Sequence, residues 1–165
     1  MSHRAFVAWP DARLRRPAQT VETISQDIRA LWDEMIDIMD AMPGYGLAAP
    51  QIGVMVRLAV VDCSTERGQA IRLANSEIIL ASSETSDWDE ASPNLPGVSA
   101  RIQRPAEVTV AFTDAEGFPA TRKFSGLWAT SVQHQIDHLA GRLYVDHLSG
   151  RKRQMLLQKA RKHRR

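Results

Sequence analysis

Two histidines, His134 and His138, stand four residues apart within residues 132–139. On an α-helix this spacing places both imidazoles on one face, one turn apart, which is the helical half of many zinc and iron sites. In those sites the residue after the first histidine is usually a glutamate, which takes a proton from metal-bound water. Here that residue is Gln135, and a neutral amide does not accept the proton. Such a pair alone is more often structural than metal-binding, so it needs support from the rest of the chain.

A helix must position these imidazoles, and the apolar residues around them predict one. Val132, Ile136 and Leu139 recur at helical spacing on a neighbouring stripe, so one side of this helix is expected to lie in a core. Ser125 can cap the start of the helix, and Gly141 is expected to end it.

The remaining elements are expected in the order helix, several strands, helix and helix. Apolar residues recur at three- and four-residue steps along 25–42, which predicts the first helix, and a last, basic helix is expected over about 149–163. Strands are expected at 57–62, 71–73, 77–81, 107–113 and 120–124. Residues 82–96 are expected to be irregular. This order predicts an α+β fold in which antiparallel strands pack around the histidine helix.

The length and composition are typical of a soluble globular protein. The chain has 165 residues, which predicts one domain over 1–165, and 44% of them are hydrophobic. It has no apolar run that could cross a bilayer and no secretory segment at its start, so no membrane partner is expected. A single cysteine, Cys63, excludes an internal disulfide and suits a reducing compartment, so a cytoplasmic location is expected.

Charge is distributed unevenly along the chain. Residues 151–165 contain eight Lys and Arg and no acidic residue. The whole chain has 21 basic and 19 acidic residues, so the other 150 residues have 13 basic and 19 acidic side chains, a net charge of −6. The core elements are expected to end before Ser149, which makes the basic helix a tail on an acidic body. Two roles stay open for this tail: a contact with RNA, or a solvated helix that keeps the body soluble.

Three stretches, in order, resemble the motifs of one family, the peptide deformylases. Residues 44–51, GYGLAAPQ, resemble the family's GxGxAAxQ motif, and residues 134–138, HQIDH, resemble its HExDH motif. Between them, residues 90–97, EASPNLPG, lie where the family has EGCLS followed by an apolar residue and proline. The resemblance covers nearly the whole chain, from about Pro10 to the basic tail. It implies a peptide deformylase-like fold and a site derived from a metalloenzyme.

The resemblance also implies a reaction and a set of metal ligands. The family removes the formyl group from the N-terminal methionine of new bacterial proteins, with Fe(II) or Zn(II) held by the two helix histidines and the motif cysteine. His134 and His138 match the histidine ligands, whereas Ser92 stands in place of the cysteine. A neutral hydroxyl is a poor ligand compared with a thiolate, so little bound metal is expected.

Two catalytic positions differ from those of the family as well. Gln135 replaces the glutamate that serves as acid and base, and Pro93, which has no N–H, replaces a leucine whose N–H faces the oxyanion. Gln51 matches the glutamine whose side chain also stabilises the oxyanion. A positioned general base contributes roughly 10²–10⁴-fold and an oxyanion donor roughly 10²–10³-fold, so the family reaction is expected to be slow or absent.

A set of substrate-binding positions follows from the same resemblance. Thr130 and Ser131, one turn before the first histidine, match positions that line the methionine side-chain pocket, and their hydroxyls should suit methionine less well. Gly46 and Leu95 lie in the matched motifs and are assigned to the same set. Tyr45 stands where the family usually has an aliphatic residue. It either alters the pocket or simply fills it, and both interpretations stay open.

Two classes of function remain. The first is an active deformylase or related amidohydrolase in which a water, Asp89 or Glu90 supplies the missing ligand. The second is a binding protein that keeps a cleft for an N-terminal peptide or small molecule but has lost the chemistry, and the three substitutions favour it. In the family the C-terminal helix can dock on the ribosome, so ribosomal RNA is the partner expected for the basic helix in either class.

Overall fold

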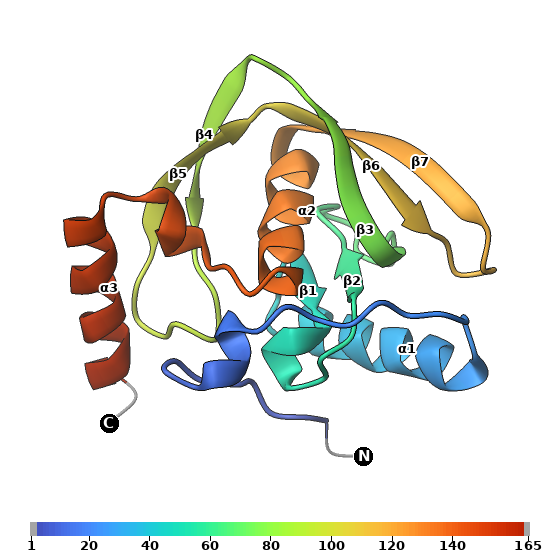
Figure 1. Cartoon of the computed structure of the whole chain (residues 1–165), viewed down its shortest axis with the longest axis horizontal. Helices are drawn as coiled ribbons and strands as arrows, with labels where there is room; N and C mark the ends of the chain where they lie inside the picture. Colours follow the sequence, from blue (N-terminus) through green and yellow to red (C-terminus); the bar gives the residue numbers. More distant parts are fainter. Residues whose placement is uncertain (1–2, 164–165) are drawn as a thin grey trace.

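The structure, a computed structural model, describes residues 3–163 and has a helix at its centre. Its helices are α1 (Gln26–Ala41), α2 (Gly126–Leu139) and α3 (Gly150–His163), with short 3-10 helices η1 (Ala12–Arg15), η2 (Ala49–Ile52) and η3 (Tyr144–His147). Its strands are β1 (Gly46–Ala48), β2 (Leu58–Val61), β3 (Ile71–Ala81), β4 (Thr85–Glu90), β5 (Ala100–Pro105), β6 (Glu107–Thr113) and β7 (Pro119–Ser125). Figure 1 shows β3, β6 and β7 arching over α2, with α3 at the left edge and α1 at the lower right. None of the helices over 3–163 has the length and apolarity needed to span a membrane.

Two antiparallel sheets surround α2. One has the strand order β1-β2-β3-β6-β7, and the other consists of β4 and β5. Val132 and Ile136 of α2 belong to the same buried cluster as Val61 of β2 and Val108 of β6, so the apolar stripe of α2 packs on the larger sheet. Ser125 is the N-cap residue of α2 as expected, although its hydroxyl makes no capping hydrogen bond. The predicted α+β fold, with antiparallel strands around the histidine helix, is confirmed.

Helix α1 packs on strands β1 and β2 and forms a second part of the core. The Ser25 hydroxyl accepts a hydrogen bond from the Ile28 N–H at 3.3 Å, which caps the helix as predicted. Trp32, Met35 and Met39 are fully buried in a cluster with residues of β1 and β2. The methionine-rich stripe of α1 is therefore part of the core and not an exposed binding surface.

The two strands predicted at 71–73 and 77–81 form a single strand, β3. Between them Asn75 has a positive φ of 54°, and its side chain is hydrogen-bonded to both the N–H and the carbonyl of Val21 at 2.8 Å. Asparagine adopts this left-handed conformation more readily than most residues, so the strand bends at this position and then continues. The predicted break was wrong because a polar residue within a bulge resembles a loop in the sequence.

The expectation that 82–96 are irregular was wrong for the first half of that segment. Strand β4 pairs with β5 along its whole length, and β5 was not predicted at all. Most side chains of this two-stranded ribbon are exposed or half-buried, so hydrophobic alternation does not mark it. The ribbon nevertheless places Glu90, at the end of β4, inside the protein beside α2.

Helix α3 begins and ends within one residue of its predicted bounds, but it is not a free tail. Ala160 is fully buried in a cluster with Leu95, Val98 and Tyr144. The expectation that the core ends before Ser149 was therefore wrong, because α3 packs on the body through a narrow apolar side. Most of its cations lie on the exposed remainder of the helix.

Candidate active site

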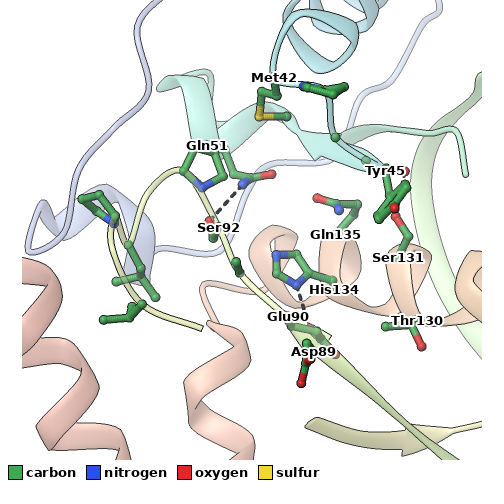
Figure 2. Close-up of a pocket in the computed structure, with 18 of the residues that line it drawn as sticks. Met42, Tyr45, Gln51, Asp89, Glu90, Ser92, Thr130, Ser131, His134 and Gln135 are labelled. Atoms are coloured by element: carbon green, nitrogen blue, oxygen red, sulfur yellow. Dashed lines mark hydrogen bonds and ion pairs between the residues drawn. The ribbon is translucent and has the colours of Figure 1, made fainter. Parts of the chain in front are cut away.

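A cavity of about 560 Å³ lies against α2 (Figure 2). Its walls come from α2, from residues 42–46 and from residues 89–98. Among the site residues predicted from the sequence, those that line this cavity are Tyr45, Gly46, Gln51, Ser92, Pro93, Leu95, Thr130, Ser131, His134 and Gln135. The remaining one, His138, lies one helical turn further along α2, with its ring centroid 5.0 Å from that of His134.

Both imidazoles are held inside the protein, because α2 is buried along all of residues 129–139. The Nε2 atom of His138 is buried and has no hydrogen-bond partner among residues 3–163. Burial lowers the pKa of His138 well below its usual value, and the neighbouring His134 lowers it further. His138 is therefore neutral, which is the state in which an imidazole nitrogen can bind a metal.

Glu90 fixes the orientation of His134. Its Oε1 lies 2.8 Å from Nδ1 of His134, and both of its oxygens accept hydrogen bonds from Arg104, at 2.6 and 2.9 Å. Burial alone would raise the pKa of Glu90, but the hydrogen bonds from Arg104 and His134 outweigh it and lower the pKa. Glu90 is thus a carboxylate, so Nδ1 of His134 donates the hydrogen bond between them, and Nε2 is the ring nitrogen that Glu90 does not contact.

Arg104 extends this network behind the histidines. It is 3% exposed and donates through Nη1 to Oδ2 of Asp137 at 3.0 Å. The same Asp137 oxygen lies 2.8 Å from Nε2 of His147. Hydrogen bonds from His147 and Arg104 outweigh the effect of burial and lower the pKa of Asp137. This network was not predicted from the sequence. Its signal was the acid within HQIDH, and nothing marked His147.

The side chain of Gln51 is tied to the loop that follows β4. Its amide Nε2 donates to Oδ1 of Asn94 at 2.7 Å and to Oγ of Ser92 at 3.3 Å, and its Oε1 accepts from the Ala48 N–H. The Ser92 hydroxyl donates in turn to Oδ1 of Asn94 at 3.0 Å. Both N–H bonds of the Gln51 amide therefore have partners within the protein, and Figure 2 marks the one to Ser92.

Asn94 is the centre of this second network, and its role was not predicted from the sequence either. Its Nδ2 donates to the carbonyls of Val7 and Gln51, at 2.5 and 2.9 Å. Backbone bonds of 2.9 Å join the same segments, since the Val7 N–H donates to Gln51 and the Trp9 N–H to Asn94. The only signal was its place in EASPNLPG, at the position of the serine in EGCLS.

Gly46 allows α2 to approach the opposite wall of the cavity. A Cβ atom at this position would lie 2.6 Å from both Nε2 of Gln135 and Oγ of Ser131, which is closer than real contacts allow. The Ser131 hydroxyl donates to the carbonyl of Tyr45 at 2.9 Å and fixes the backbone there. Tyr45 is 54% exposed, so it stands at the rim and does not fill the cavity.

Comparisons with known proteins agree with this geometry. The family model described as polypeptide deformylase matches residues 3–154. The chain belongs to the peptide deformylase family. It is 39% identical over 163 residues to the peptide deformylase of Rhodopseudomonas palustris (strain BisA53), covering 96% of this chain and 91% of that protein. It is 40% identical over 161 residues to that of Rhizobium meliloti (strain 1021), covering 96% and 92%.

Solved structures of the peptide deformylase family have the same fold. The peptide deformylase of Legionella pneumophila superposes with a TM-score of 0.91 at 37% identity, over 99% of this chain and 96% of that one. The enzyme of Ehrlichia chaffeensis in complex with actinonin superposes with a TM-score of 0.93 at 34% identity, over 100% and 99%. The resemblance to the peptide deformylases is thus confirmed.

Peptide deformylases are metal-dependent hydrolases, but the donor atoms of this member do not fit their metal. The two imidazoles are suitable, whereas the third position is the hydroxyl of Ser92, which is already hydrogen-bonded. Glu90 is no substitute because Arg104 and His134 occupy its oxygens, and the Asp89 side chain is 76% exposed. Across residues 3–163, no group of three or more His, Cys, Asp and Glu is arranged to hold a metal ion.

Proposed function

We propose that this member of the peptide deformylase family keeps a cleft for an N-terminal peptide or another small ligand and has lost most or all of the hydrolytic activity. The observation that carries the proposal is the state of Ser92. A neutral hydroxyl held by Gln51 and Asn94 stands where the family has its third metal ligand. Two neutral imidazoles and a hydroxyl that already makes hydrogen bonds are a weak set of donors for Fe(II) or Zn(II).

The reacting groups support the same proposal. Gln135 lines the cavity beside His134, and its amide has no basic group that could take a proton from a water molecule. Pro93 has no N–H to offer an oxyanion, and both N–H bonds of Gln51 point to Asn94 and Ser92. An oxyanion in this cleft would have to compete with those two oxygens for its donors.

Metal analysis tests the proposal. We expect the purified protein to contain much less than one Zn or Fe per chain, and the Ser92→Cys variant to contain more, because a thiolate restores a strong donor. Ser92→Ala is the matched control, since it removes the hydroxyl without adding a ligand. Full, tightly held metal in the unaltered protein would overturn the proposal and show that another group completes the site.

One observation favours an alternative, an active amidohydrolase with a substitute ligand. The buried Nε2 of His138 lacks a hydrogen-bond partner within the described part of the chain, which is costly unless a bound species relieves it. In this alternative Asp89 or a water molecule is the third ligand of the metal, beside His134 and His138. Full metal occupancy that is lost in Asp89→Asn would establish the Asp89 version.

The basic face of α3 supports a second proposal, a cytoplasmic contact with ribosomal RNA. Its exposed cations include Arg151, Lys152, Lys159, Arg161 and Lys162. Because Ala160 is buried in the core, deleting the helix would disturb the body, whereas replacing exposed cations leaves the packing intact.

Sedimentation with ribosomes provides the test. We expect the unaltered protein to co-sediment at low salt and to dissociate at moderate salt, because neutralised phosphates release counterions. The triple variant Arg151→Gln, Lys159→Gln, Arg161→Gln should sediment much less. A control with the same loss of charge on the body is Arg16→Gln, Arg122→Gln, Lys123→Gln. Equal sedimentation of the two variants would contradict a specific role for α3 and favour the solvated helix.

A further inference from the structure

Four polar side chains of α2 form one wall of the cavity. Thr130, Ser131, His134 and Gln135 occupy one face of the helix, since residues four apart lie one above the other. All four line the cavity, and each is between 4% and 8% exposed. Figure 2 shows His134 and Gln135 on the side that faces Gln51 and Ser92.

Two of these four side chains each make one hydrogen bond within the protein. Ser131 donates to the carbonyl of Tyr45, and His134 is bonded to Glu90. The other two do not, because Oγ1 of Thr130 and Oε1 of Gln135 are buried and have no partner anywhere in residues 3–163. A buried polar atom without a partner costs free energy, which a ligand that supplies the missing hydrogen bond recovers. Both residues line the cavity, so a ligand bound there lies against these two side chains.

The charges of the residues that line the cavity limit which chemical group of a ligand can bind there. No Lys or Arg is found among its described lining residues, so nothing there neutralises an anionic group. Of its two carboxylates, Glu90 is already paired with Arg104 and the Asp89 side chain is 76% exposed to water, so neither offers much to a cation. The apolar Leu127 lies in the same wall as Thr130. A neutral side chain with a hydrogen-bonding end matches this mixture of apolar wall and unpaired oxygens.

We propose that the cleft selects a peptide whose first side chain is neutral and polar, of the carboxamide class, and that Thr130 determines this selection. The proposal rests on the peptide-binding function proposed above. A carboxamide both donates and accepts, and so does a hydroxyl, so the two can pair. Glutamine has nearly the same length as methionine, so the two side chains differ mainly in their polar atoms.

Calorimetric titration with two matched peptides tests the proposal. N-formyl-Gln-Ala-Ala is expected to bind the unaltered protein roughly threefold to tenfold more tightly than N-formyl-Met-Ala-Ala, which is the range for one net hydrogen bond. Thr130→Val, which keeps the shape of the side chain, should remove this preference. Thr130→Ser, which keeps the hydroxyl, should preserve it. Thr121→Val on the exposed face of β7 is the matched control and should change nothing.

Each outcome has a definite meaning. Tighter binding of the methionine peptide overturns the selection proposed here and leaves the peptide-binding function standing. Binding of neither peptide to a folded protein overturns both. A glutamine preference that survives in folded Thr130→Val overturns the role of Thr130. If Thr130→Val does not fold, loss of the preference in Thr130→Ser would likewise contradict the assignment to the hydroxyl.

Discussion

An N-formyl-methionyl peptide is expected to be deformylated with a turnover below about 0.1 per second, at least 10²-fold under the typical enzyme value of about 10 per second. The missing base at Gln135 alone accounts for a loss of roughly 10²–10⁴-fold. The missing N–H of Pro93 and the engaged amide of Gln51 add to this loss, although such factors do not simply multiply. Formate release in the presence of added Fe(II) or Zn(II) is the measurement.

Partial restoration separates these causes. Gln135→Glu alone should recover little activity, because Ser92 and Pro93 still leave the metal and the oxyanion poorly held. The triple variant Ser92→Cys, Pro93→Leu, Gln135→Glu should recover more than any of its single substitutions. Gln158→Glu on the exposed side of α3 adds the same charge away from the cavity and serves as the control. Turnover of about 1–10³ per second in the unaltered protein would contradict the loss of activity.

Arg104→Met is expected to lower the free energy of unfolding by about 3–5 kcal/mol, the usual cost of removing one partner from a buried ion pair. The guanidinium is 3% exposed and is shared by Glu90 and Asp137, so its removal leaves two buried carboxylates without their cation. Urea unfolding followed by circular dichroism measures the change. The control is Arg101→Met in the same strand, because the Arg101 side chain is 64% exposed and should cost under about 1 kcal/mol.

The contribution of this network to the free energy of unfolding depends on pH. The pKa values of Glu90 and Asp137 are lowered in the folded protein. The stabilisation that these two carboxylates provide is therefore fully present at a pH above their pKa values in the unfolded chain. It is lost as the pH falls through the lowered folded values. The difference in stability between the unaltered protein and Arg104→Met should therefore shrink in acid. A difference that stays constant from neutral to strongly acidic pH would contradict the ionic origin.

Each of the three motifs contributes residues to the wall of the cavity, so the motifs predicted part of that wall. The partners that determine what those residues can do were not predictable in the same way. Asn94 holds Gln51 and Ser92 through side-chain hydrogen bonds between segments far apart in the chain. No periodicity or spacing encodes such bonds. His147 is a comparable case, since it meets Asp137 only when η3 folds back beside α2.

The elements of the fold likewise differ in how well the sequence predicts them, according to whether neighbouring or distant residues stabilise them. Helices α1, α2 and α3 follow from apolar spacing and capping residues, which act within a few turns. The β4–β5 ribbon is stabilised by backbone pairing and by the buried side chains of Ile102 and Arg104, while most of its other side chains are polar and exposed. Pairing of this kind leaves little hydrophobic pattern for a sequence to reveal.

The hydrogen bonds of Asn94 also bear on the order in which the protein assembles. They reach back 87 residues to Val7 and 43 residues to Gln51. Ordering such long loops costs conformational entropy before any contact repays it, whereas a helix such as α1 needs only its own neighbours. The network around Gln51 can therefore form only after the N-terminal segment, η2 and the loop after β4 have come together. We therefore expect the floor of the cleft to form late in folding, and a fragment that begins after Val7 lacks the carbonyl that accepts one of the hydrogen bonds of Asn94.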